Sequence, residues 1–410
     1  MKFITFQKPN LYHLFFIIYF VTIMIKQTLE SNIFEENLIS VKFFQMYSNI
    51  LSHILSIIPF LIIKYRSKSN DKSQEKYNSE NALQLIHNNL IKTYKGENVI
   101  KYTFLTSFFY FLSEAIICIF LFINNIPELY SSYSLYIYSI LNCVVLYITS
   151  YFILKTTFYK HHYLSFIINL ICVLIDLIID ITQIIQQRIT NYMYYIYIIV
   201  ILFKLTFLCI FDNYAKLAMH SAFLSPNSLL LNMSIYEIFF LIIFSLPFIF
   251  ITVEDFDGIN DIIFKGFLKY LTGNKLIYSI IYFINNFFLE LFLLYIIDKF
   301  SPSHIALAIS LNPFCLNLFY MFHYLIKGEV VYWYRFINFF IFLLVIIGSM
   351  IHNEIFIINK WGLNKKTKLY LNKEFNAESI DPEGIDSDTY LDSNEEKKEN
   401  ETEIELISNS

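Results

Sequence analysis

The stretch "TSFFYFLSEAIICIFLFI", residues 106–123, is almost entirely apolar and has a single carboxylate, Glu114, near its middle. An uninterrupted apolar run of this length is long enough to cross the hydrocarbon core of a bilayer as an α-helix. A charged side chain at the centre of such a helix costs roughly 2.5–3.5 kcal/mol. Glu114 is therefore expected to face a protein interior or a water-filled cavity rather than lipid.

Similar runs recur along the 410 residues, of which 56% are hydrophobic and only 16% are charged. A β-barrel would show short alternating segments, and a soluble domain of this size would carry more charge. The sequence thus predicts an all-α integral membrane protein with about ten transmembrane helices. The predicted helices lie near 11–25, 43–63, 103–123, 132–154, 163–180, 192–211, 231–252, 276–297, 304–325 and 336–357.

The two halves of the chain resemble each other in several short patterns. "SIIPFLII" at 56–63 matches "FSLPFIFI" at 244–251, and "SFFYF" from Ser107 matches "SIIYF" from Ser279. Five spans in each half would make the halves inverted-topology repeats, as in many secondary transporters. We therefore predict one five-helix repeat over 1–180 and a second over 181–359. Coincidence in a chain of biased composition is the alternative explanation.

The polar segments predict the orientation of the chain in the membrane. Lys and Arg concentrate in the N-terminus, in the polar loop 64–102 and in the short connections on the same side, which places both termini in the cytosol. The segment 360–410 is rich in acids and predicts a disordered cytosolic tail. Within it, "EIELI" at 403–407 resembles an acidic dileucine sorting signal. This favours a vacuolar, lysosomal or Golgi membrane over the plasma membrane.

Polar residues recur at helical spacing in three of the predicted helices, so that each helix has one polar face. Such a face suits a helix that lines a substrate cavity, because polar groups in lipid need partners or water. Hydrogen bonding between helices is the simpler explanation for the isolated Ser and Asn residues. The predicted cavity residues are Glu114, Glu290, Gln45, Asn49, His53, Ser107, Tyr110, Tyr282, Asn286 and Lys204.

Other buried ionisable groups and prolines extend this hypothesis. Lys204 could neutralise one carboxylate, and the remaining acidic surplus would suit a cationic solute or a proton-coupled cycle. Asp176 and Glu237 are predicted nearer to helix ends and receive less weight. Three prolines inside predicted helices are candidate hinges; these are Pro59, Pro247 and Pro313.

The C-terminal stretch "FSPSHIALAISLNPFCLNLFYMFHYLIKGEVVYWYRFINFFIFLLVIIGSMIHNE", from Phe300, resembles the last two helices of the drug/metabolite transporter superfamily. The similar features are a mid-helix Pro313, the pair Gly328-Glu329, Gly348 and the polar exit "HNE" at 352–354. "SSYSLYIYSILNCVVLYITSYFILKTTFYKHHYLSFIINLICVLI", from Ser131, is similar to the fourth and fifth helices.

The resemblance spans 103–357, and Glu114 falls near an acidic position of solute-carrier-35-like and chloroquine-resistance-transporter-like members. It implies an EamA-type carrier with ten helices in two inverted repeats and alternating access without ATP. The chain departs from the family in its low content of Gly and Ala, its long loop 64–102 and its lack of a helix-embedded Lys-Arg pair.

The sequence gives little support to other functions. The five cysteines lie in predicted helices without CxxC spacing, so no metal site is predicted. His161 and His162 lie in a predicted turn after Lys160, where lipid headgroups are the expected contact and a metal would need further ligands. A membrane acyltransferase using His323 or His352 with Asn338 lacks supporting spacing.

We therefore predict no enzymatic activity, no catalytic residues and no cofactor. The expected partners are the lipid bilayer, a small-molecule solute and a second copy of the chain in a homodimer, with no nucleic acid. A non-transporting membrane scaffold or receptor remains the alternative to a carrier, and it would make the buried acids dispensable.

Overall fold

The computed structural model describes residues 4–6, 13–33, 38–62, 98–124, 134–186, 193–250, 270–273, 275–327, 333–364 and 367. Long helices dominate these residues, and two short strands, β1 (Ile4–Phe6) and β2 (Phe356–Ile358), pair antiparallel. The helices are α1 (His13–Ile33), α2 (Leu38–Ser52), α5 (Asn98–Asn124), α6 (Ser134–Leu154), α7 (Lys160–Gln186), α8 (Met193–Ser221), α9 (Pro226–Phe250), α11 (Lys275–Lys299), α12 (Pro302–Lys327) and α13 (Trp333–His352).

A helix stands at each of the ten predicted positions, but several ends differ from the prediction. After α2 a single 3₁₀ turn, η1 (His53–Ser56), leads into helical residues 57–62, so that the predicted span 43–63 contains a change of helix type. The predicted last helix is wrong beyond residue 352, because α13 ends there and β2 begins at Phe356.

Two of the predicted domain limits fall inside helices. The limit at residue 180 lies within α7, which continues to Gln186. Residues 98–102 of the predicted polar loop belong to α5. The rest of that loop, and the tail apart from residues 360–364 and 367, lie outside the described residues.

Helix α8 extends ten residues beyond its predicted end because its polar last turns find partners within the protein. Asn213 is fully buried and donates from Nδ2 to the Cys209 carbonyl at 2.7 Å. Lys216 is also buried, and its Nζ donates to the carbonyls of Asp298 and Phe300 at 3.2 Å each. Because these polar side chains have hydrogen-bond partners inside the protein, the helix can continue through them.

Helix α7 has the reverse of the amphipathic pattern found in soluble proteins. Ser165, Asn169 and Asp176 are fully buried on its inner face. The residues exposed on its other face are apolar and follow at helical spacing; they are Ile167, Leu170, Ile171, Leu174, Ile175 and Ile178. Because exposed isoleucine and leucine in this density are unfavourable in water, the outer face is one that lipid covers.

Over the described residues, eight helices are long and apolar enough to cross a membrane. They lie within Val41–Ile62, Val99–Phe120, Lys160–Ile179, Ile198–Ser221, Pro226–Leu246, Lys275–Lys299, Pro302–Tyr324 and Arg335–His352. Helix α6 contributes a shorter apolar stretch, Ile140–Ile153. This is the composition of a multi-pass helical membrane protein.

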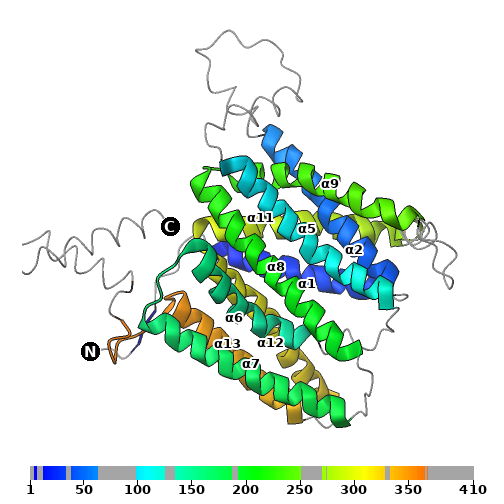
Figure 1. Ribbon diagram of the computed structural model, residues 1–410. Coiled ribbons are helices and arrows are strands. Elements are labelled where there is room, and N and C mark those ends of the chain that lie inside the picture. The colour runs from blue at the N-terminus through cyan, green and yellow to red at the C-terminus, as the bar shows by residue number, and fades with distance from the viewer. Residues whose placement is uncertain are drawn as a thin grey trace, which may run out of the picture.

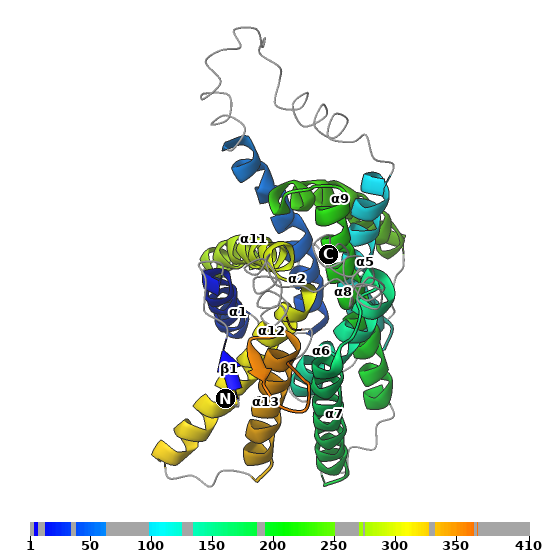
Figure 2. The ribbon, with the colours of Figure 1, turned by 90° about the vertical axis from the view of Figure 1, so that its left-hand side faces the viewer.

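The helices form two groups that meet at α8 (Figure 1). Helices α2, α5, α9 and α11 lie on one side of α8, and α6, α7, α12 and α13 lie on the other. Helix α8 packs on both α5 and α6, and α1 packs on both α11 and α12. Figure 2, turned by 90°, shows α1 beside α11 and β1 below α1.

The buried apolar residues form two main clusters that follow this division. The larger cluster includes Met46, Ala115, Phe211, Leu229 and Leu294, which come from α2, α5, α8, α9 and α11. The second cluster joins α6, α7, α8, α12 and α13.

Helices α7 and α13 approach each other closely at Gly348. The Ser165 Oγ donates to the Gly348 carbonyl at 2.6 Å. A Cβ added at Gly348 would lie 2.7 Å from the Asn169 Oδ1 and 3.3 Å from a methyl carbon of Ile168. The glycine is therefore required by the close approach of the two helices, as at small-residue contacts between membrane helices.

Candidate functional site

A charged network lies among helices α1, α2, α5, α8, α9 and α11, and its centre is Glu114 of α5. The Glu114 Oε1 of α5 forms an ion pair with the Lys204 Nζ of α8 at 3.2 Å. On its other oxygen Glu114 accepts a hydrogen bond from the Asn49 Nδ2 at 3.0 Å. The Lys26 Nζ of α1 donates to the Asn49 Oδ1 at 3.4 Å. The carboxylate therefore has a base and an amide on either side of it, as a buried charge requires.

A second pair in the network joins η1 to α9. The His53 Nδ1 and the Glu237 Oε2 are 2.6 Å apart, and both side chains are completely buried. The His53 ring also lies 5.0 Å from the Tyr110 ring. Tyr110 in turn donates through its hydroxyl to the Glu290 Oε1 of α11 at 3.2 Å. A chain of proton-bearing groups thus runs from α9 through η1 and α5 to α11.

A third set of contacts lies where α1 meets α11. The Tyr282 hydroxyl donates to the Glu30 Oε1 at 3.1 Å, and the Lys26 Nζ lies 5.7 Å from the centre of the Tyr282 ring. Nearby in α2, the Lys42 Nζ donates to the Gln45 Oε1 at 2.8 Å. The charged network is defined here as Lys26, Glu30, Lys42, His53, Glu114, Lys204, Glu237 and Glu290.

The structure brings eight of the ten predicted cavity residues into this network or into contact with it. The two exceptions are Ser107 and Asn286, which are buried in α5 and α11. The Ser107 hydroxyl donates within its own helix to the Thr103 carbonyl at 2.8 Å. Ser107 thus conforms to the simpler expectation that a buried Ser satisfies a local hydrogen bond.

Sequence reasoning missed three of the eight members of the charged network and gave less weight to a fourth, Glu237. Lys26, Glu30 and Lys42 were outside the predicted spans 11–25 and 43–63, because a span was ended where charge began. The helical spacing of Lys26 and Glu30, four residues apart, was the available signal that both lie on one face of a longer helix. Glu237 was expected near a helix end, but it lies in the middle of α9 and is fully buried.

The predicted hinge prolines lie in helical segments. Pro313 is inside α12, Pro59 is in helical residues 57–62, and Pro247 is within the bounds of α9. Bending at these positions remains a prediction.

The three residues "HNE" at 352–354, noted in the sequence as a polar exit, form a separate polar end to α13. His352 stacks on the Tyr147 ring with centroids 3.7 Å apart. Asn353 binds α12, because its Oδ1 accepts from the Ser303 Oγ at 2.6 Å and its Nδ2 donates to the Ser303 carbonyl at 3.2 Å. Glu354 faces His161 of α7 at 3.5 Å.

In comparisons with known proteins, no family model matches this chain and no curated protein is significantly similar to it. The class of the protein therefore rests on its own helices, which are those of a multi-pass helical membrane protein with a charged network in its interior.

Proposed function

We propose that the protein is a secondary carrier of small charged metabolites that works by alternating access. The charged network carries this proposal. Isolated charges in the bilayer interior are costly, and they mark solute or proton pathways in membrane proteins. Pairing reduces that cost, yet a structural core of similar volume could be built more cheaply from apolar residues. A network of eight ionisable groups is thus easier to explain by function than by stability.

The position of the contacts supports a carrier. Four contacts of the network each join a residue before position 181 to one after it. Glu114 binds Lys204, His53 binds Glu237, Tyr110 binds Glu290, and Glu30 binds Tyr282. If the two halves rock against each other, these are the contacts that must break and re-form. A solute that replaces one partner of such a pair would be bound where the halves meet.

The packing of the helices also supports two repeats of five. When each helix of the first half is exchanged for the helix at the same place in the second half, the main packing pairs map onto one another. The pair α5 and α8 becomes α11 and α1, the pair α5 and α9 becomes α11 and α2, and α6 and α7 become α12 and α13. The pairs α2 and α9, α6 and α12, and α7 and α13 map onto themselves. A pseudo-two-fold axis between inverted repeats would produce this pattern.

The network also narrows the solute. The acidic surplus expected from the sequence is smaller once Lys26 and Lys42 are included, because three lysines and His53 face four glutamates in the network. A zwitterion or a peptide-like solute would match such a mixed site better than a plain cation. The His53–Glu237 pair could exchange a proton during the cycle, because histidine titrates near neutral pH. The non-enzymatic role, cytosolic termini, endomembrane location and homodimer expected from the sequence belong to the same proposal.

Uptake into proteoliposomes of the purified protein tests the proposal. The panel would include amino acids, short peptides and nucleotide sugars, each with and without a pH gradient. Glu114→Gln and Glu290→Gln remove charges of the network, and Asp176→Asn is the control, because Asp176 is also a carboxylate inside the protein, fully buried where the two glutamates are partly buried, and it lies in α7 outside the network. We expect uptake by the wild type and the control, and about a tenfold or greater loss in both network variants, the cost of roughly 1.4 kcal/mol in transition-state binding.

Two results would contradict the proposal. If the folded wild type transports nothing in the panel, the scaffold or receptor explanation takes first place. If uptake is unchanged in Glu114→Gln and Glu290→Gln, the charged network is structural and the solute passes elsewhere.

A further inference from the structure

A second polar cluster lies at the opposite group of helices, outside the charged network. It consists of His161 and His162 in the first turn of α7 and Glu354 just after α13. One ring nitrogen from each histidine and one Glu354 carboxylate oxygen lie within 4.8 Å of one another. The adjacent histidines are visible in the sequence, but their proximity to the carboxylate is not, because nearly two hundred residues separate His161 from Glu354.

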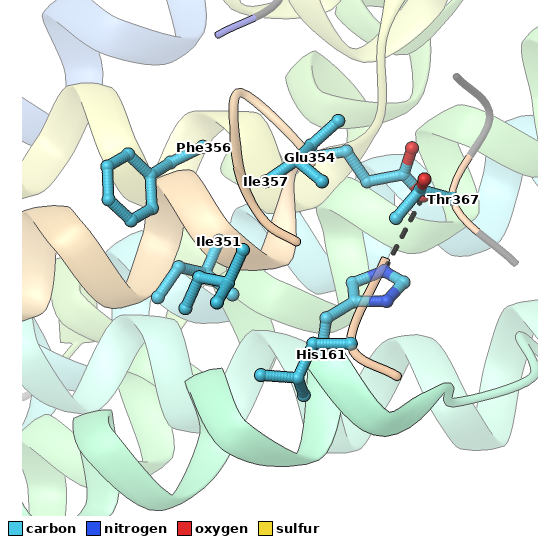
Figure 3. Close-up of a pocket in the computed structure, with 8 residues that line it drawn as sticks. His161, Ile351, Glu354, Phe356, Ile357 and Thr367 are labelled. Carbon is cyan, nitrogen blue, oxygen red and sulfur yellow. Dashed lines mark ion pairs between the residues drawn. The ribbon is translucent and has the colours of Figure 1, made fainter. Parts of the chain in front are cut away.

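His161 is the unusual member of the cluster. Its side chain is only 3% exposed, contrary to the expected contact with lipid headgroups. Neither of its ring nitrogens makes a hydrogen bond with any described residue. The Nε2 faces the Glu354 Oε1 at 3.5 Å, which is beyond hydrogen-bond distance (Figure 3). A buried imidazole normally has a partner for at least one nitrogen, so this site is one that a further atom would complete.

The carboxylate is held in position by its surroundings. Asn353 fixes the end of α13 to Ser303 through the two hydrogen bonds described above. Glu354 itself has a φ of +56°, a left-handed conformation that non-glycine residues seldom adopt. This turn ends α13 and directs the Glu354 side chain back toward the start of α7 (Figure 3).

A small pocket lies beside His161 and Glu354, and its size suits an ion rather than an organic ligand. The pocket lined by His161, Glu354, Ile351 and Phe356 holds about 10 Å³. That volume is about the minimum that admits one water molecule. Two imidazoles and a carboxylate are ligands of zinc and related first-row divalent ions, and calcium or magnesium would prefer oxygen donors.

We propose that His161, Glu354 and His162 form a binding site for Zn²⁺ that joins the start of α7 to the end of α13. Zinc bonds of about 2.0–2.2 Å in tetrahedral geometry would draw the three donor atoms from within 4.8 Å to about 3.3 Å of one another. Three protein ligands leave the fourth position for water.

His162 is the weaker of the two histidine ligands. Its Nδ1 accepts a hydrogen bond from the Tyr159 backbone amide at 3.0 Å. Zinc binding through the His162 Nδ1 would break this hydrogen bond, and binding through its Nε2 would require that nitrogen to lose its proton. Neither His161 nitrogen makes a hydrogen bond with a described residue. The expected order of importance is His161 and Glu354 first, and His162 second.

The test is a calorimetric titration of Zn²⁺ into the purified full-length protein after treatment with a chelator. The variants are His161→Gln, Glu354→Gln and His162→Gln, and the control is His323→Gln, which removes an exposed histidine on α12. We expect one Zn²⁺ per chain in the wild type and the control. Loss of a ligand should weaken binding by more than about 100-fold, since outer-shell substitutions alone cost 10–100-fold. The loss in His162→Gln should be smaller.

A second measurement, the change in Tm on addition of Zn²⁺, tests the proposal even if a variant is less stable than the wild type. Zn²⁺ should raise the Tm of the wild type and of His323→Gln, because a ligand that binds only the folded state stabilises it. It should not raise the Tm of Glu354→Gln, because the glutamine side chain has nearly the same size but lacks the negative charge that binds the metal. The proposal fails if the wild type binds no Zn²⁺ at one equivalent, or if Glu354→Gln binds it as well as the wild type does.

Discussion

Lys204 and Glu114 are opposite charges in the interior of the helix bundle, and each offsets the cost of burying the other. Their side chains are 22% and 14% exposed and 3.2 Å apart, and Asn49 also donates to Glu114 at 3.0 Å. Removing one partner of a buried pair leaves an uncompensated charge, which costs about 3–5 kcal/mol.

We therefore expect Lys204→Met to lower the Tm of the purified protein, and Lys204→Met combined with Glu114→Gln to restore most of the loss. Thermal unfolding in one detergent, for the two single variants and the double variant, measures the coupling. Additive losses in the double variant would show that the two side chains do not depend on each other.

At the same scale, the sequence predicted which polar residues are buried better than it predicted their partners. The positions of Glu114 and Glu290 in long apolar runs were sufficient to place them inside the protein. The pairing of His53 with Glu237 joins residues 184 positions apart, and no local pattern contains that information. The predicted spans were systematically too short where charged residues occur near helix ends. Ending a span at a charged residue assumes that lipid surrounds the helix at that point, whereas protein surrounds it here.

At the scale of elements, the contact between α7 and α13 gives a steric prediction. Gly348→Ala would place a methyl group 2.7 Å from the Asn169 Oδ1, so the helices must separate or Asn169 must move. Overpacking of this kind costs roughly 1–3 kcal/mol.

We expect Gly348→Ala to lower the Tm, and to lower it less in a chain that also carries Asn169→Ala, since the smaller side chain removes the nearest obstacle. Circular dichroism during heating of the four proteins measures both effects. An equal loss in both backgrounds would place the obstacle elsewhere than Asn169.

The strand pair gives a second prediction at this scale. Thr5 lies opposite Ile357 in the antiparallel register of β1 and β2. Directly opposed positions have Cβ atoms about 4.5–5.5 Å apart, close to the separation that a disulfide needs.

Thr5→Cys with Ile357→Cys should therefore form a disulfide under mild oxidation. Thr5→Cys with Ile358→Cys is the control, because neighbouring positions in a strand point to opposite faces. Mobility on gels after a single proteolytic cut in the chain separates linked from unlinked protein. Equal linking in both pairs would indicate that the register is not fixed.

The strands were absent from the prediction because three residues at each site are too short to show a period of two. Helix positions were predictable for the opposite reason, since about twenty apolar residues give a signal that no turn can imitate. Helix type was not predictable, because the single 3₁₀ turn at His53 arises in a predicted span that has no Gly or Pro between residues 43 and 58.

At the scale of the whole molecule, the strand pair bears on topology. Because β1 pairs with β2, the chain before α1 and the chain after α13 lie at the same side of the helices. If the bundle spans the membrane, both ends are exposed to one compartment, as the distribution of Lys and Arg predicts.

In sealed, right-side-out vesicles from cells that express the protein with a different tag at each end, we expect protease to remove both tags or neither. Permeabilised vesicles are the control for tag accessibility. Removal of one tag alone would exclude an even number of spans between the two tags.

The contact between α1 and α11 cannot form until long after α1 has been synthesised, because its two residues are far apart in the chain. Glu30 is synthesised early, but Tyr282, whose hydroxyl donates to it, is made 252 residues later. At translation rates of about 5–20 residues per second, this is a delay of roughly 13–50 s. During that interval Glu30 lacks the tyrosine hydroxyl that later donates to it, whereas Asn49, the partner of Lys26, follows within 23 residues. The contact between α1 and α11 can therefore form only after the second half of the chain has been made, and α1 must find other surroundings until then.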